Sequence, residues 1–543
     1  MAPVPFQHPV RYTSLAAVGI YLMSVVYLTY AIATSLYASY KSISPAQDTR
    51  SRIAQRKRLV PTFLGLAVAA LGLATYTSVA SASLSYRTWA YERGLDQPER
   101  FIFEEEIFIE PENSSNVKFL YIAHWLSDTP IYYDSLEIVA EKARRFWWGQ
   151  QIDLATVAFS MLLSIEGRRR NIPLTAGFLL LAHLVNLSFA QNLFYLALLL
   201  IPSPLPSGTG ELDLPVAPLR ASRFIPPKPK NWHLRPSILL MVLWLNYVSI
   251  FLLPYAAETT SFTTVALLTR ALTFLPLILP TIAPVSWGTV HLHPHDAYGS
   301  FTTIFRTISV ASFVLHVKSS IAGLIYNMPN SHYHRHSAFF PWDVEERTNW
   351  ERSTTALGKV LGSLYDHPSV KAVGLDVMGC ALSLGLWAAV RATDIQDIIE
   401  STIPFYNFRR KIETAVEQKR PSTPIKVDSD PAEDVTSEHS MTLRSRGRST
   451  KSRVGSVASS SGPSEEGTGT PGRRRGRPKR TKEPEEEKAY EPASSELRNL
   501  VEGDVVPASE LDWESAALAW GLAAIAGLGS ASAGVFGGEC ISR

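Results

Sequence analysis

The chain contains only two cysteines among its 543 residues. Cys380 and Cys540 cannot build the disulfide framework that stabilises small secreted domains. The sequence also lacks a Gly-rich P-loop, a Gly-x-Ser-x-Gly nucleophile turn, a haem-ligating cysteine motif and an Asp-Asp-x-x-Asp motif for magnesium-bound diphosphate. These absences argue against ordinary soluble ATPases, serine hydrolases, cytochromes P450 and diphosphate-dependent terpene synthases.

Charge is scarce in most of the chain and concentrated in one part, so the mean hydropathy of +0.03 averages two populations. Residues 1–392 are apolar and rich in aromatic side chains, which predicts a multi-pass transmembrane domain. Residues 393–511 are dominated by Ser, Pro, Glu, Lys and Arg and cannot bury enough apolar surface to fold, so we expect a disordered tail. Residues 512–543 form a possible C-terminal transmembrane segment.

Long apolar runs are the dominant positive signal. A helix needs about 20 residues at a rise of 1.5 Å per residue to cross roughly 30 Å of hydrocarbon. The pattern predicts an all-α fold, a transmembrane helical bundle of about eight to nine spans. The expected spans are Thr13–Tyr37, Leu59–Tyr86, Phe146–Ile165, Ile172–Pro202, Ser237–Tyr255, Phe262–Val285, Phe301–Met328, Ala372–Val390 and the weaker, Gly- and Ala-rich segment Ser515–Phe536.

Basic residues predict the orientation of the first four spans. The loop around Arg50–Arg58 and the loop at Arg168–Arg170 should both be cytoplasmic. The loop between the second and third spans is then lumenal, and it contains the glycosylation sequon that begins at Asn113. We therefore expect a multi-pass glycoprotein of the endoplasmic reticulum membrane.

The later topology stays open. Strict alternation places the tail in the lumen, whereas its many basic residues favour the cytoplasm. One segment could be re-entrant, and Tyr121–Arg145 is the suspect because Pro130 interrupts it. The basic run Arg473–Arg480 resembles a DNA-binding hook, but on a membrane protein we interpret it as a solvated stretch near anionic lipid and expect no nucleic-acid partner.

Histidines cluster at His291–His295 and at His332–His336, and imidazole is a common metal ligand. Their alternate spacing differs from the three- and four-residue spacing of helical metal sites. The two clusters also flank one expected span, which places them on opposite faces of the membrane. We therefore expect neither a metal site nor a cofactor.

The block from Phe119 to Asp153 places carboxylates among apolar segments, where an ionised Asp costs roughly 2.5–3.5 kcal/mol. His124 and Asp128 are four residues apart and share a helix face, and Glu137 belongs to a second acidic face. Asp153 lies seven residues into an expected span, and Gln150 shares its face. The plain alternatives are a helix-end carboxylate for Asp128, a solvated face for Glu137 and an interhelical contact for Asp153.

The fourth apolar segment is unusually polar. It contains His183 and Asn186, so this helix should face the bundle interior, either for interhelical hydrogen bonding or to line a cavity. Lys318 and Asp376 are further charges in apolar runs and could neutralise each other.

The segments Ala123–Pro130 and Arg144–Gln151 resemble those of the fungal integral-membrane terpene cyclases of meroterpenoid pathways, of the ascofuranone and macrophorin type. The resemblance covers roughly residues 10–395 and has no counterpart for the tail. It implies acid-initiated cyclisation of a prenylated substrate that arrives from the lipid bilayer.

The resemblance implies roles for individual residues. A protonated Asp128 or Asp153 would be the acid, with His124 and Glu137 as further catalytic candidates. Aromatic faces would stabilise the carbocation, although tryptophans here could equally form an interfacial belt. The candidate substrate-binding residues are Trp125, Tyr132, Tyr133, Trp147, Trp148, Gln150, His183 and Asn186.

Two other classes stay open. A transporter or channel is favoured by the polar fourth segment and the membrane-depth charges, and it would predict paired broken helices and an internal repeat. No internal repeat is apparent in the sequence. A non-enzymatic scaffold of the endoplasmic reticulum is favoured by the long tail.

Overall fold

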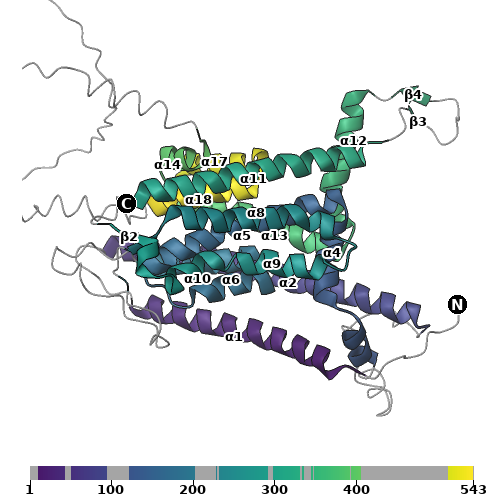
Figure 1. Cartoon of the computed structure of the whole chain (residues 1–543), viewed down its shortest axis with the longest axis horizontal. Coiled ribbons are helices and arrows are strands. Elements are labelled where there is room, and N and C mark those ends of the chain that lie inside the picture. The colour runs from purple at the N-terminus through teal and green to yellow at the C-terminus, as the bar shows by residue number, and fades with distance from the viewer. Residues whose placement is uncertain are drawn as a thin grey trace, which may run out of the picture. The chain divides into compact units, whose positions relative to one another are not determined.

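A computed structural model describes residues 10–42, 50–94, 121–201, 228, 232–291, 297–329, 333–335, 344–346, 348–391, 393–404 and 511–541. These residues belong to one unit of the chain, and residues 413–493 of the second unit lie outside the described part. Most of the described residues are helical (Figure 1). The helices are α1 (Tyr12–Ser42), α2 (Arg50–Glu92), α4 (Ile131–Glu141), α5 (Ala143–Arg169), α6 (Thr175–Leu184), α7 (Leu187–Leu200), α8 (Pro236–Ala256), α9 (Phe262–Leu272), α10 (Leu275–Ile282), α11 (Tyr298–Asn327), α12 (Asn349–Gly362), α13 (Pro368–Arg391), α14 (Ile395–Thr402), α17 (Trp513–Ile525) and α18 (Leu528–Ile541).

The remaining elements are short. The strands β1 (Trp232–Leu234) and β2 (Gly288–Val290) form one antiparallel pair, and β3 (Tyr333–Arg335) and β4 (Val344–Glu346) form another. Two turns of 3₁₀ helix lie at Val285–Trp287 and Ser363–Tyr365.

Helices lie at all the positions where spans are predicted. Five are long and apolar enough to cross a membrane, namely α1, residues 57–92 of α2, α8, α11 and α13. The pair α9–α10 would be a sixth, with a bend of 55°. The expected all-helical, membrane-compatible fold is therefore confirmed at this level, by length and composition.

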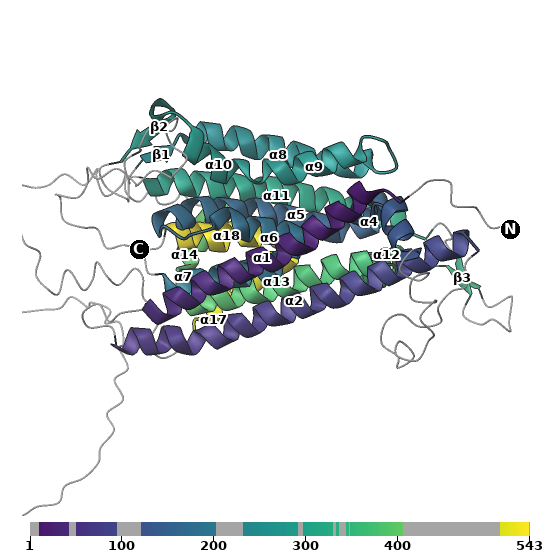
Figure 2. The same ribbon diagram turned by 90° about the horizontal axis from the view of Figure 1, so that it is seen from below.

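The bundle is built around α5. Residues 154–163 of α5 are all buried, and this helix packs against α18, α11 and α13. The helices α1 and α2 lie along one side of the bundle (Figure 2). Most of their large apolar side chains are exposed, as expected for helices that face lipid.

The bundle has two ends, and charged residues identify them. The basic end carries Arg168–Arg170, where α5 terminates, and Arg391, where α13 terminates. The α12 end is the opposite one, where Asp366 accepts hydrogen bonds from Arg144 (2.8 Å) and Arg145 (3.4 Å) near the start of α5.

The helices α6 and α7 form a hairpin that enters and leaves at the basic end. The helix α6 begins there, because Thr175 lies against Gly167 of α5. The tip lies deep in the bundle, where the backbone N–H of Leu187 donates to Asp376 of α13 (3.0 Å). The helix α7 then returns, so that carbonyl groups at its end accept hydrogen bonds from Arg170.

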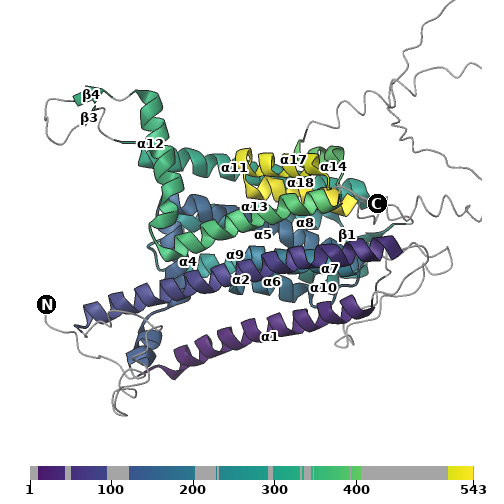
Figure 3. The same cartoon turned by 180° about the vertical axis from the view of Figure 1, so that it is seen from behind.

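The helices α17 and α18 form a second hairpin from the same end, and they lie side by side in yellow in Figures 1 and 3. At the start of α17, Ser515 Oγ donates to the carbonyl of Thr393 (2.8 Å), just beyond α13. At the tip, the N–H of Leu528 donates to Gln151 of α5 (2.9 Å). At the end of α18, the carbonyl of Cys540 accepts from Arg169 (3.3 Å).

These two hairpins correct the sequence analysis. The segments Ile172–Pro202 and Ser515–Phe536, each expected as one span, are pairs of antiparallel half-length helices. The segment suspected of re-entry, Tyr121–Arg145, instead places helical residues 121–128 and α4 on either side of Pro130. Re-entry of Tyr121–Arg145 stays a prediction.

The described ends of the predicted tail also contain structure. The helix α14 begins at residue 395, and its Ile398 is fully buried against the bundle. The helix α12 lies across the bundle end, roughly perpendicular to the long helices (Figures 1 and 3). Its residues Trp350, Leu357 and Leu361 form an exposed apolar stripe, an arrangement typical of helices at a membrane interface.

A buried ion network closes the basic end. Glu539 of α18 accepts two hydrogen bonds of 2.8 Å from Arg391 of α13, and it lies 3.2 Å from Arg170. Arg170 also contacts Glu166 at 2.9 Å. All four side chains are at most 5 % exposed, so α5, α13 and α18 are joined by ion pairs that are shielded from solvent.

Removing one charge from this network should destabilise the protein strongly. We expect Glu539→Gln to lower the free energy of unfolding by about 3–5 kcal/mol, because the buried Arg391 and Arg170 would both lose this carboxylate. Thermal unfolding in detergent, followed by labelling of the buried thiol of Cys380, measures the effect. The control Glu514→Gln changes an exposed carboxylate in the first turn of α17 and should cost under ~1 kcal/mol. Equal effects of the two substitutions would contradict the assigned role.

Candidate functional site

The helix α7 begins at the tip of its hairpin, where Leu187 and Ser188 are buried. The first N–H groups of a helix have no partner within the helix, so they need acceptors from elsewhere. Asp376 of α13 supplies two, because its carboxylate accepts from the N–H of Leu187 (3.0 Å) and of Ser188 (2.7 Å). Asn186 supplies a third by accepting from the N–H of Phe189 (3.0 Å). A carboxylate on one helix therefore caps the start of another.

Asp376 has no ion-pair partner among the residues that the structure describes. The side chain is 6 % exposed and lies eight residues after Pro368, about 12 Å along the helix axis. Lys318, the expected partner, instead stands over the rings of Phe251 (3.8 Å) and Tyr255 (4.7 Å). The suggested neutralisation of Asp376 by Lys318 is therefore wrong.

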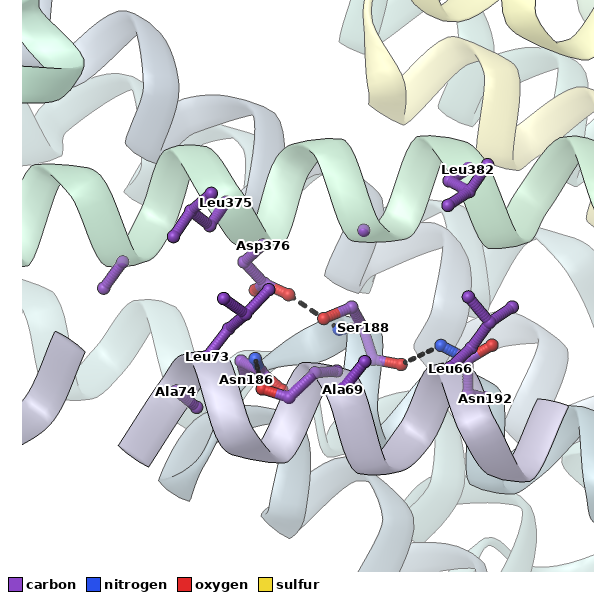
Figure 4. A pocket seen from close by; sticks show the side chains of 13 residues that line it. Leu66, Ala69, Leu73, Ala74, Asn186, Ser188, Asn192, Leu375, Asp376 and Leu382 are labelled. Atoms are coloured by element: carbon purple, nitrogen blue, oxygen red, sulfur yellow. Dashed lines mark hydrogen bonds between the residues drawn. The ribbon is translucent and has the colours of Figure 1, made fainter. Parts of the chain in front are cut away.

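A cavity of about 110 Å³ lies beside this cap, between α2, α7 and α13 (Figure 4). We call it the tip cavity. Its polar lining comes from Asn186, Ser188, Asn192 and Asp376. Its walls are otherwise apolar, formed by Leu66, Ala69, Ala70, Leu73, Ala74, Ala372, Leu375, Gly379 and Leu382.

Asn192 is one of the polar residues that line the tip cavity. This side chain is 2 % exposed, and its Nδ2 donates to the carbonyl of Ser188 one turn earlier (2.8 Å). Its Oδ1 has no hydrogen-bond partner among the described residues. An unsatisfied buried acceptor of this kind costs about 1–3 kcal/mol.

The second hairpin tip has a similar cap with different chemistry. Gln151 of α5 lies eight residues after Ala143, and its Oε1 accepts from the N–H of Leu528, the first residue of α18. Its Nε2 lies 2.6 Å from Nδ1 of His316 on α11. An amide nitrogen can only donate, so Nδ1 must accept and His316 is neutral with its proton on Nε2.

Four of the residues predicted for the site lie near the α12 end in ordinary contacts. Asp128 accepts from Arg93 (2.6 Å) and from the indole of Trp89 (3.2 Å), so it serves as an ion-paired helix-end carboxylate. His124 lies one turn before it. The indole of Trp125 donates to Ser85 (3.2 Å), and Glu137 accepts from the N–H of Glu258 (2.8 Å).

Other predicted residues gather around Arg270 of α9, to which the sequence analysis gave no role. Arg270 donates to Nδ1 of His183 (2.9 Å), and its guanidinium stands over the ring of Tyr132 (5.7 Å). It is also the charge that acts on Asp153 of α5. Tyr133 packs edge-on against Tyr132 (5.5 Å). Residues from α4 and α6 thus contact one cation.

The remaining predicted residues lie elsewhere. Trp147 and Trp148 pack edge-on (4.9 Å) and donate to Ser320 of α11 and to the carbonyl of Val360 of α12. Gln150 is fully buried, and neither of its amide atoms has a hydrogen-bond partner within the described part of the chain.

Asn186 lines the tip cavity, and its Nδ2 donates to the carbonyl of Ala70 of α2 (3.2 Å). Asn113 lies outside the described residues, as do His293, His295, His332 and His336. Among the described residues there is no group of three or more His, Cys, Asp or Glu that could hold a metal ion.

The sequence analysis missed the capping roles of Asp376 and Gln151. A signal was present for both hairpins, because the run from Ile172 to Pro202 is longer than a span needs and has Asn186 near its middle. The last apolar segment has Gly527 at the corresponding place. Comparison with known proteins adds no assignment, since no protein-family model, no curated protein and no solved structure matches the chain.

The second hairpin tip should tolerate only glycine at residue 527. Gly527 has φ +86°, and an added Cβ would lie 2.8 Å from His316 and 2.9 Å from Gln151. We expect Gly527→Ala to lower the free energy of unfolding by about 1–2 kcal/mol or more, from the backbone conformation alone. The control Gly521→Ala in α17 meets open space and should raise stability by about 0.5–1 kcal/mol. Thermal unfolding in detergent compares the two, and a neutral Gly527→Ala would refute the tight tip.

Proposed function

We propose that the chain is a transport protein of the endoplasmic reticulum membrane, with a substrate site at the tips of its re-entrant hairpins. The observation that carries the proposal is the pair of half-length hairpins whose tips are both capped eight residues into a neighbouring helix. Helix ends at membrane depth are tolerated only where protein buries them or where they line a cavity. Discontinuous helices of this kind form the substrate and ion sites of many transporters.

The hairpins also give a consistent membrane topology for this proposal. If neither hairpin crosses, the crossing elements are the five long apolar helices α1, α2, α8, α11 and α13 and the bent pair α9–α10. We add the central helix α5, which is 27 residues long but less apolar, and this makes seven. The basic loops after α1 and α5 belong in the cytoplasm, which places the residues before α1 in the lumen. An odd number of crossings then returns the chain to the cytoplasm after α13. The tail after residue 404 then lies in the cytoplasm too, as its basic composition favours.

The cavity supports a small solute rather than a large one. A volume of about 110 Å³ lies well below the roughly 300–1,000 Å³ of sites for drug-sized molecules. Release of α7 from its cap on Asp376 would open the cavity toward the basic end, because both ends of that hairpin lie there. The cap is thus the natural gate between a closed and an open state.

Transport is tested with purified protein in proteoliposomes and a panel of labelled small solutes, which includes amines, inorganic cations, amino acids and sugars. We expect uptake of at least one solute above empty vesicles, and a loss of about tenfold or more in Asp376→Asn, which corresponds to about 1.4 kcal/mol. The control Asp394→Asn retains a capping side chain at the exposed start of α14 and should leave uptake unchanged. Folded, correctly inserted protein that moves no solute in the panel would contradict the proposal.

A second candidate is the acid-initiated cyclisation of a prenylated meroterpenoid substrate. It is favoured by the contacts of His183 and Tyr132 with Arg270, whose charge also acts on the buried Asp153. It ranks second because the tip cavity is small for a prenyl chain and lies on other helices.

Cyclisation is tested by expression in a fungal host that is fed a farnesylated aromatic compound and its epoxide. If the chain is a cyclase, we expect a cyclic product that disappears in Asp153→Asn and persists in Asp128→Asn, because Asp128 is held by Arg93. Mass spectrometry of the extracts gives the readout. The absence of product from both substrates, with the protein present in the membrane, would remove this candidate.

A further inference from the structure

We infer that α12 is an interfacial helix, whose exposed apolar stripe of Trp350, Leu357 and Leu361 inserts into the lipid headgroup layer at one face of the membrane. The inference goes beyond the proposed function and does not depend on it. It holds for either orientation of the chain, and the topology proposed above makes this face the lumenal one.

The position of α12 places it at the boundary of the bilayer. The helix α11, which is long and apolar enough to span, ends at Asn327. Near the start of α12, Arg352 donates to the carbonyl of Pro329, two residues beyond that end (3.4 Å). In Figures 1 and 3, α12 lies roughly perpendicular to the long helices and extends past α11. A helix that crosses the end of a span at this angle lies along the membrane surface.

Contacts with the bundle fix the rotation of α12 about its own axis. Ala356 and Val360 are 0 % and 3 % exposed. The carbonyl of Val360 accepts from the indole of Trp148 on α5 (3.2 Å). Val360 also packs so closely on Gly323 of α11 that a Cβ added to this glycine would lie 3.2 Å from it. The apolar stripe is therefore held in one direction, beside the bundle.

The exposed surface of α12 divides into an apolar and a polar side. At 3.6 residues per turn, the three residues of the apolar stripe fall within about 40° of one another around the helix axis. With the buried Ala356 and Val360 they form one continuous apolar arc of about 140°. The polar side lies away from this arc and consists of the exposed residues Glu351, Thr355 and Lys359. This division is the pattern of helices that lie in a membrane interface.

The apolar stripe suits a lipid surface better than a protein partner. Standard protein interfaces use about 20–30 residues on each side, whereas the stripe has three. Its most exposed member is Trp350 (77 %), and indole rings are enriched at the level of the lipid headgroups. The polar side carries one charge of each sign, on Glu351 and Lys359, so the attraction does not require anionic lipid. The partner that fits is a zwitterionic lipid surface.

Spin labels on the full chain in phosphatidylcholine liposomes test the inference. The two natural cysteines are fully buried, so a nitroxide will react with a cysteine introduced on α12. The test variant is Leu357→Cys, and the matched control is Thr355→Cys, which is exposed on the polar side of the same helix. Power saturation compares the access of oxygen, which concentrates in lipid, with that of a water-soluble nickel chelate.

We expect the label at residue 357 to lie about 5–10 Å into the headgroup layer and the label at residue 355 to lie in water. A label at Leu361→Cys should report the same depth as the one at residue 357. One nitroxide per chain shows that the bundle is intact, because unfolding would expose Cys380 and Cys540.

Two other results would overturn the inference. Equal access of the nickel chelate to residues 355 and 357 would show that water covers the stripe. A label at residue 357 that neither reagent reaches would show that protein covers it, either a partner or a second copy of the chain.

Discussion

The constraint on which the structure depends is the need of backbone N–H groups for acceptors where water is absent. Two helices, α7 and α18, begin deep inside the bundle, so their first N–H groups have no partners of their own. Side chains from the central helices supply the acceptors, Asp376 from α13 and Gln151 from α5. The position of each hairpin is thereby fixed by hydrogen bonds at its tip, in addition to the apolar packing around it.

The two caps solve one problem with different electrostatics. Gln151 is neutral and is itself held by His316, so that tip is closed and glycine fits there with little space to spare. Asp376 is a carboxylate, and a cavity lies beside it. The two tips are built in the same way, but only the one capped by Asp376 has a charged cap and a cavity beside it. That tip is therefore the candidate binding site.

The sequence predicted the positions of the helices well and their directions poorly. Hydropathy records how apolar a segment is but not whether it continues straight or folds back, so Ile172–Pro202 and Ser515–Phe536 were expected as single spans. For the polar fourth segment both alternatives apply to Asn186, because its Nδ2 donates to the carbonyl of Ala70 on α2 and the residue also lines the cavity. Asp128 and Glu137 were predicted to belong to one site because they are close in sequence. In the structure they make separate contacts, with Arg93 and with the N–H of Glu258. Asp376 was weighed only as one charge among several, because its partners are backbone groups some 190 residues away.

The ion network at the basic end imposes an order on the synthesis of the protein. Arg170 and Glu166 can pair as soon as α5 is made, but the pairs that Arg170 and Arg391 make with Glu539 form only after α18. More than a hundred residues separate α13 from α18, so they must all be synthesised before the network closes. Until then, the surfaces of α5 and α11 that α18 covers remain open to other partners in the membrane.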